Sequence, residues 1–129
     1  MSKGYRVLLD ANIIHRDLKP ENILIHNGTY KLADFGMSKR LRDTEIIQNI
    51  SYKGTPLYIA PEIIEKQVGS SKIDIFSLGC IIYQLMYDGN HPFYDEKKKY
   101  SSYEQYYSSI KEVEVQFKQK NKKGEFRSI

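Results

Sequence analysis

The segment from Lys72 to Tyr87 places the strongest constraint on how this chain can fold. A helix over this segment carries apolar residues on every side, namely Ile73, Ile75, Phe76, Leu78, Cys80, Ile81, Ile82, Leu85 and Met86. A helix that is apolar all round belongs in the interior of a domain. Ser71 with Asp74 three positions later fits a capping box at its start, and Gly89 supplies its stop. The sequence therefore predicts one buried central helix.

The residues before this segment predict a second helix and a hairpin. Residues 3–12 are typical of the last turns of a helix. Ile23–Ile25 and Thr29–Ala33 are predicted strands, and Asn27-Gly28 between them is a strong two-residue turn signal because both positions tolerate positive φ. The predicted fold class is mainly α with a small β-hairpin (α+β), in a single domain or part of one.

The remaining segments are less regular. Residues 37–61 are rich in hydroxyl side chains and are predicted to be irregular. The tail, residues 95–129, carries more Lys and Arg than Asp and Glu, with a predicted helix at about 102–110 and a weak strand at 113–117. Its basic run, residues 118–123, is interpreted as a solvated loop, with a docking patch as the alternative. Its tyrosines are interpreted as packing and surface residues rather than phosphorylation sites: Tyr100, Tyr103, Tyr106 and Tyr107.

Composition excludes several classes of protein. The single Cys80 allows neither an internal disulfide nor a multi-cysteine zinc site, and its apolar neighbours predict a small buried hydrophobe. No apolar run approaches the roughly 18 residues that a membrane-spanning helix needs, and the N-terminus does not resemble a secretory signal. The net charge of +4 comes without an arginine-rich patch. We therefore expect an intracellular, cytoplasmic protein with no membrane or nucleic-acid partner.

Two short motifs carry the chemistry. His15-Arg16-Asp17-Leu18-Lys19-Pro20-Glu21-Asn22 places a carboxylate five residues before an amide, and Asp34-Phe35-Gly36 follows twelve residues later. Phosphoryl transfer needs alignment, neutralisation of phosphate charge and a group that orients the attacking hydroxyl. Asp17 has the chemistry to accept a hydrogen bond from a hydroxyl, and Asn22 and Asp34 offer the oxygen ligands that Mg²⁺ prefers. Lys19 could reach a transferring phosphate as a point charge.

These motifs resemble the catalytic and metal-binding loops of eukaryotic serine/threonine protein kinases. Gly54–Glu62 resembles the end of an activation segment in that family. Asp74–Gly79 resembles the start of its central helix, with Phe76 where tryptophan is usual, and Gly89–Phe93 resembles the loop that follows. Lys19 and Thr55 favour serine/threonine over tyrosine specificity. The resemblance implies a protein-kinase-like C-terminal lobe, incomplete at both ends, that uses ATP and Mg²⁺ and acts on Ser or Thr of a protein substrate.

The resemblance also implies residue roles. Asp17 would be the catalytic base and Lys19 its phosphate-contacting partner. The ATP-binding residues would be Lys19, Glu21, Asn22, Leu24 and Asp34, with Asn22 and Asp34 as the magnesium ligands and Leu24 under the adenine. His15 and Phe35 would stack on each other, and Asp74 would hold the catalytic-loop backbone, in addition to any interaction with the macrodipole of its own helix.

Regulation is implied by Arg16. In the family this arginine pairs with a phosphate on the activation segment. Ser51, four residues before Thr55, stands where that phosphate is expected, and Thr44 is a weaker candidate. We therefore expect an upstream kinase that acts on Ser51 and thereby orders residues 37–62.

The family pattern divides the chain into residues 1–36 with the catalytic and metal-binding loops, 37–62 with the activation segment, 63–94 with the central helix, and 95–129 as a divergent basic, Tyr-rich tail. Nothing before His15 can be the Gly-rich loop, strand lysine or helix glutamate that cover ATP in the family. Three explanations stay open: a part of a longer kinase, a non-catalytic binding module that acts as a decoy or regulator of intact kinases, and a degenerate product without a stable fold. The first is favoured because Asp17, Asn22 and Asp34 are all retained.

The family pattern also leaves one carboxylate without its usual partner. No convincing counterpart exists for the arginine that pairs with Glu62 in the family, because Arg127 lies outside the usual motif. Glu62 is thus predicted to be an unpaired carboxylate, which is costly if buried.

Overall fold

The computed structural model of the chain describes residues 2–42, 47–48, 56–66, 68–94, 98, 100, 102–110, 113, 115, 118–120 and 126–128. Its helices are α1 (Ser2–Asp10), α2 (Pro61–Lys66), α3 (Lys72–Met86) and α4 (Tyr103–Ile110), with 3₁₀ turns η1 (Pro20–Asn22) and η2 (Pro56–Tyr58). Its strands are β1 (Ile13–Ile14), β2 (Ile23–His26), β3 (Thr29–Leu32), β4 (Lys39–Arg40), β5 (Ile47–Gln48), β6 (Val68–Gly69), β7 (Lys118–Lys120) and β8 (Phe126–Ser128). They pair antiparallel as β1–β4, β2–β3, β5–β6 and β7–β8. Within this part of the chain no helix is long and apolar enough to cross a bilayer.

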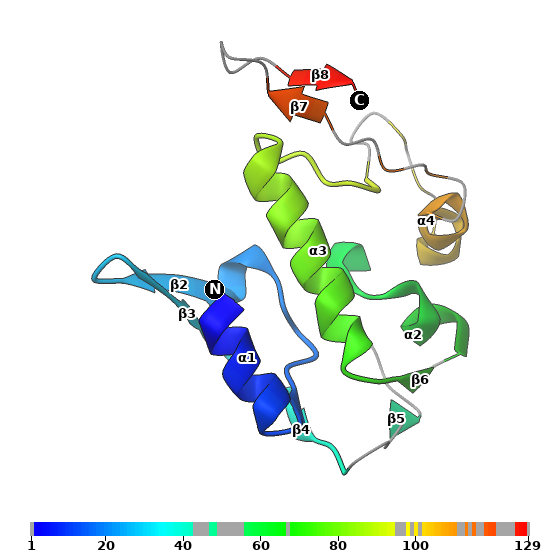
Figure 1. The fold of residues 1–129 in the computed structure, drawn as a ribbon. Coiled ribbons are helices and arrows are strands. Elements are labelled where there is room, and N and C mark those ends of the chain that lie inside the picture. Colours follow the sequence, from blue (N-terminus) through cyan, green and yellow to red (C-terminus); the bar gives the residue numbers. More distant parts are fainter. Residues whose placement is uncertain are drawn as a thin grey trace.

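Helix α3 runs through the middle of the molecule, with α1 and the β2–β3 hairpin to one side and α2 and α4 to the other (Figure 1). One core cluster joins Tyr5 and Leu8 of α1 to Cys80 and Ile81 of α3, with Leu18 between them. Cys80 is only 1% exposed, and burial raises the pKa of its thiol to about 12, so the predicted small buried hydrophobe is confirmed. The packing of α3 against both sides positions the His15–Asn22 loop.

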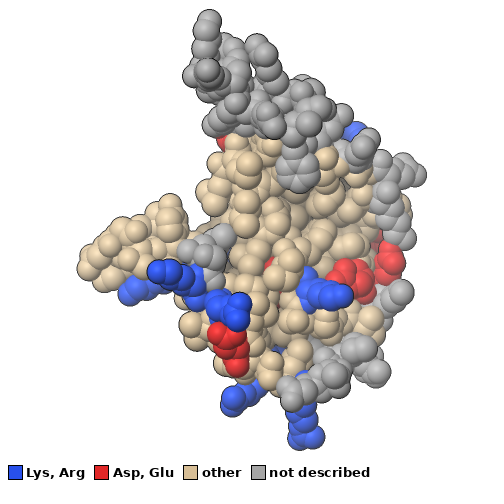
Figure 2. Space-filling model, viewed as in Figure 1, with Lys and Arg blue, Asp and Glu red and all other residues tan. Residues whose placement is uncertain are grey.

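The prediction that α3 is buried all round is wrong on one side. Ile75, Ile82, Leu85 and Met86 are all exposed, Leu85 to 72%. In the face of the molecule drawn in Figure 2, charged side chains are sparse over the middle and lie mainly toward the lower edge. Helical periodicity shows which positions can be buried, but the neighbouring elements decide which of them are, and no described element covers this side of α3.

The start of α3 differs from the prediction, and its end agrees with it. Ser71 has helical dihedrals and makes no side-chain cap, so the predicted capping box is wrong. Instead, the Lys72 N–H donates to Ser70 Oγ at 3.3 Å. At the other end Gly89 adopts φ +85°, and its N–H donates to the Gln84 carbonyl at 2.8 Å, which confirms it as the stop.

The hairpin prediction is confirmed. Strands β2 and β3 pair from Ile23 opposite Leu32 to His26 opposite Thr29. Asn27 and Gly28 between them both have positive φ, +49° and +69°, as a tight two-residue turn requires.

Two less regular regions contain more strand than predicted. In residues 37–61 the structure describes β4, β5 and η2, whereas residues 43–46 and 49–55 lie outside the described part. In the tail, Val113 and Val115 are not in a strand, and β7 lies instead in the basic run predicted to be a loop. The helix predicted at about 102–110 is confirmed as α4, whose buried Tyr106 and Tyr107 bear out their interpretation as packing residues. Strand β7 pairs antiparallel with the nearby β8, from Lys118 opposite Ser128 to Lys120 opposite Phe126.

The loop after α3 contains a partly buried histidine. His91 Nδ1 accepts a hydrogen bond from the Phe93 N–H at 3.2 Å, and its ring lies edge-on to Tyr58 with centroids 5.6 Å apart. Burial lowers the pKa of His91 to about 4, from an ordinary value of 6.5, against the raising effect of a hydrogen bond to the Leu57 backbone.

We expect the stability of the fold to fall on acidification because of His91. The unfolded chain takes up this proton near pH 6.5 and the folded chain near pH 4, so the contribution is complete above pH 6.5 and is lost as pH falls toward 4. Its size, discounted for partial exposure, is about 1–2 kcal/mol. Urea unfolding between pH 4 and 7 should show a flatter pH dependence for His91→Asn, which keeps an acceptor for the Phe93 N–H. The exposed His26→Asn is the control, and equal slopes for both variants would contradict the assignment.

Candidate functional site

The His15–Asn22 loop is held at its start by Asp74 in the first turn of α3. Asp74 Oδ2 accepts the His15 N–H at 2.7 Å, and Oδ1 accepts the Arg16 N–H at 2.9 Å. Arg16 has a left-handed φ of +68°, a conformation that needs such support in a non-glycine residue. Burial raises the pKa of Asp74, which is 1% exposed, while the two N–H bonds and the nearby His15 and Arg16 lower it. The predicted role of Asp74 under this backbone is confirmed.

Asp17, Lys19 and Asn22 form one hydrogen-bonded group. Lys19 Nζ lies 2.9 Å from Asp17 Oδ2. Asn22 is buried, and its Nδ2 donates to the Asp17 carbonyl at 2.8 Å and to Asp17 Oδ2 at 3.1 Å. The Asn22 amide nitrogen thus orients the Asp17 carboxylate, which leaves the Asn22 amide oxygen as the atom available to a cation.

Nearby carboxylates stabilise the positive charge of Lys19. The hydrogen bond that Lys19 donates to Asp17 raises the pKa of Lys19 against the lowering effect of desolvation, and the charges of Asp17, Glu21 and Asp34 raise it further. Lys19 is therefore a fixed positive charge beside Asp17.

Asp34 is placed by the residue before it. The Ala33 N–H donates to the Asn22 carbonyl at 2.9 Å, and the Ala33 carbonyl lies 3.0 Å from His15 Nε2. Both backbone groups of Ala33 are thus bound to the His15–Asn22 loop, and Asp34 follows with a left-handed φ of +58°. The His15 and Phe35 rings lie in contact as predicted, with centroids 5.0 Å apart, but tilted by 54° rather than stacked.

The available oxygen atoms fit a divalent cation that arrives with phosphates. In the described part of the chain no three His, Cys, Asp or Glu side chains gather as an all-protein metal cage. Mg²⁺ is usually bound through one or two carboxylates with substrate phosphates and water completing the shell. The exposed Asp34 carboxylate and the Asn22 amide oxygen match that donor set.

Comparison with known proteins agrees with this geometry. Residues 1–128 match the family model described as the protein kinase domain. The chain belongs to the protein kinase domain family. The helices and small antiparallel strands fit the fold of such a kinase.

Three curated relatives illustrate the similarity of this kinase chain. It is 48% identical over 93 residues to serine/threonine-protein kinase TIO of Arabidopsis thaliana, covering 71% of this chain and 7% of the relative. It is 41% identical over 97 residues to serine/threonine-protein kinase ATG1b of the same plant, covering 72% and 13%. It is 45% identical over 91 residues to the cAMP-dependent protein kinase catalytic subunit 3 of Drosophila melanogaster, covering 70% and 15%. The chain thus spans only a small part of these relatives.

The other residues singled out in the sequence fall into three groups. Leu24 on β2 and Glu21 on η1 are exposed, Leu24 to 53%, so both side chains are open to a ligand. Glu62 is only partly buried, and no cationic partner is found for it among the described residues. Ser51 and Thr55 lie outside the described residues, as do Thr44 and the side chain of Arg127.

Arg16 has a partner that the sequence did not suggest. Its Nε donates to the Met37 carbonyl, so the side chain is directed toward the segment that follows Gly36. Because the partner is a backbone carbonyl, which every residue carries, no signal in the sequence could have identified it. The same holds for Ala33, whose backbone ties Asp34 to the loop.

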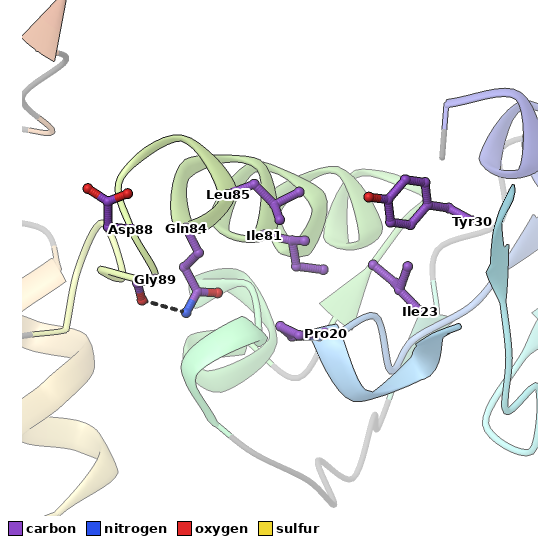
Figure 3. A pocket seen from close by; sticks show the side chains of 8 residues that line it. All are labelled: Pro20, Ile23, Tyr30, Ile81, Gln84, Leu85, Asp88 and Gly89. Atoms are coloured by element: carbon purple, nitrogen blue, oxygen red, sulfur yellow. Dashed lines mark hydrogen bonds between the residues drawn. The ribbon is translucent and has the colours of Figure 1, made fainter. Parts of the chain in front are cut away.

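An apolar groove of about 580 Å³ adjoins the His15–Asn22 loop in this kinase chain (Figure 3). It lies between the β2–β3 hairpin and the C-terminal half of α3, and its lining residues are Pro20, Ile23, Tyr30, Ile81, Gln84, Leu85, Asp88 and Gly89. Gln84 at its wall donates from Nε2 to the Gly89 carbonyl at 3.2 Å and accepts the Tyr58 hydroxyl at 2.8 Å. Through Gln84, this wall is joined to η2.

Proposed function

We propose that this chain is part of the C-terminal lobe of a serine/threonine protein kinase that transfers the γ-phosphate of ATP to Ser or Thr hydroxyls of a protein substrate. Residues 1–36 carry the catalytic and metal-binding loops, 37–62 the activation segment, 63–94 the central helix and 95–129 the tail. The observation that carries the proposal is the Asp17–Lys19–Asn22 group, tied to Asp34 through both backbone groups of Ala33.

Each residue has a role that its contacts support. Asp17, oriented by Asn22, accepts the hydrogen bond of the attacking hydroxyl and aligns it. Lys19, held beside Asp17, places a positive charge at the transferring phosphate. Asn22 and Asp34 would hold Mg²⁺, which when bound would neutralise phosphate charge. Lys19, Glu21 and the exposed Leu24 complete the ATP site, with Leu24 under the adenine.

A polypeptide of residues 1–129 by itself is expected to show negligible phosphotransfer. Residues 1–14 supply no Gly-rich loop and no lysine for the α/β-phosphates, so ATP would lack the alignment that can contribute effective molarities of ~10⁵ M or more. Measurable ATP-dependent phosphorylation by the purified 129-residue chain, abolished by Asp17→Asn, would contradict this expectation.

The experiment that tests the function starts from the transcript. Its ends should be mapped, and the longest protein that contains residues 1–129 should be expressed and assayed with ATP, Mg²⁺ and a mixed protein substrate. Phosphate on Ser and Thr, lost in Asp34→Asn and retained in Asp10→Asn, is the expected result. A protein that carries no ATP-covering loops and transfers no phosphate would instead favour the alternative, a non-catalytic binding module that acts on intact kinases.

Phosphorylation of Ser51 by an upstream kinase is proposed to switch this kinase on. The Arg16 side chain is already directed to the start of the activation segment through Met37, so a phosphate there would find a guanidinium prepared to bind it. Ser51→Ala should lower the activity of the longer protein at least tenfold, as measured by steady-state kinetics. It should also abolish the activating phosphorylation, as measured by phosphopeptide mapping. Thr29→Ala, at the exposed start of β3, is the control, and unchanged phosphorylation and activity in Ser51→Ala would contradict the proposal.

A further inference from the structure

The 3₁₀ turn η2 is held from outside by side chains of two helices. Ser77 Oγ on α3 donates to the Tyr58 carbonyl at 2.7 Å. The Tyr107 hydroxyl on α4 donates to the Pro56 carbonyl and lies 3.3 Å from the Ile59 carbonyl. Inside the turn, the Ile59 N–H donates to the Pro56 carbonyl at 3.2 Å. The shape of this short turn thus depends in part on these side chains.

Tyr107 reaches η2 from a buried position. Only 3% of it is exposed, and it packs with Ile110 of α4 in a cluster that also contacts Leu57, Ile59 and Phe93. A buried phenol hydroxyl normally finds a hydrogen-bond partner, and here that partner is the backbone of the turn. Helix α4 therefore contacts η2 by both packing and hydrogen bonding.

The neighbouring tyrosine shows that burial alone does not produce such a bond. Tyr106 is also 3% exposed and lies in the same cluster, 5.1 Å from the Tyr107 ring, yet its hydroxyl has no partner among the described residues. The two side chains share helix, burial and chemistry and differ in whether they hold η2. This pair supplies a matched control.

We propose that Tyr107 is a positioning residue for the protein substrate, which it serves by fixing the backbone of Pro56–Ile59. The inference rests on the proposed function and adds that η2, at the end of the proposed activation segment, shapes the pocket beside the phosphoacceptor of the protein substrate. Tyr107 touches neither substrate nor ATP and acts through the turn. Its removal should therefore loosen the pocket without disturbing the Asp17–Lys19–Asn22 group.

The first test needs no catalytic activity. In the 129-residue chain, Tyr107→Phe keeps the ring and removes the hydroxyl, and amide hydrogen exchange at Leu57, Ile59 and Ala60 should accelerate about tenfold, as the loss of one hydrogen bond predicts. Tyr106→Phe should leave these rates unchanged. Ser77→Ala, which removes the other bond to the turn, should accelerate the same amides. Equal exchange in Tyr107→Phe and Tyr106→Phe would overturn the inference.

The second test uses the longer protein. Tyr107→Phe should raise KM for a peptide substrate roughly three- to tenfold and leave KM for ATP unchanged, while Tyr106→Phe changes neither. Faster exchange without a change in peptide KM would overturn the role in substrate positioning. The two tests can also disagree. If Tyr107→Phe exchanges faster than Tyr106→Phe but the longer wild-type protein transfers no phosphate, the proposed function and the substrate role are both overturned. The bond from Tyr107 to η2 would then be a structural feature only.

Discussion

Replacing Asp17 with asparagine is expected to lower kcat of the longer, phosphate-transferring protein by ~10² to 10⁴, the range typical of general-base assistance. Asparagine keeps an oxygen that can accept from Asn22 Nδ2, so the loop should retain its shape. It carries no negative charge, however, and cannot accept the proton of the substrate hydroxyl. KM for ATP should change little because Asn22 and Asp34 are untouched.

Steady-state kinetics with ATP and peptide varied in turn would measure this effect. Asp10→Asn is the matched control, since Asp10 is an exposed carboxylate that pairs with Arg6, 3.0 Å away on the surface of α1. An Asp17→Asn protein with kcat within about tenfold of wild type would contradict the role of Asp17. A large rise in KM for ATP with normal kcat would assign it to binding instead.

Replacing Asp74 with asparagine is expected to lower the free energy of unfolding of the chain by about 2–4 kcal/mol. The Asp74 carboxylate accepts one backbone N–H on each oxygen, from His15 and from Arg16. Asparagine offers one acceptor, and its NH₂ group would face the second N–H, so a buried donor loses its partner. Because burial raises the pKa of Asp74, removal of the charge recovers part of the desolvation cost, and the figure is a net one.

Urea unfolding at neutral pH would measure this loss, with Asp10→Asn again as the control, expected to cost about 0.5 kcal/mol or less. Asp74→Asn should also lower the activity of the longer protein, because the left-handed Arg16 would lose its support. Equal stability of the Asp74→Asn and Asp10→Asn chains would show that the two backbone donors do not depend on Asp74.

Much of the local structure followed from the sequence. The limits of α3, its stop at Gly89 and the turn at Asn27-Gly28 are set by helical periodicity and by the few residues that tolerate positive φ. The cap at Ser71 was mispredicted because Asp74 turns its carboxylate to a backbone 58 and 59 residues away instead of to its own helix. The strand predicted in the tail was also misplaced, since Val113 and Val115 lie in no strand and β7 begins at Lys118, where it pairs with β8.

The sequence by itself determined the chemistry available to this protein: a carboxylate, a lysine and an amide within six residues, and a second carboxylate on the other side of a hairpin. The first three groups must lie near one another in space, because the chain between them is too short to separate them. Only the tertiary structure decided that Ala33 joins Asp34 to His15 and Asn22, that one side of α3 stays exposed, and that Tyr107 rather than Tyr106 holds η2. These contacts join residues far apart in the chain through backbone groups that all residues share, so packing alone selects them.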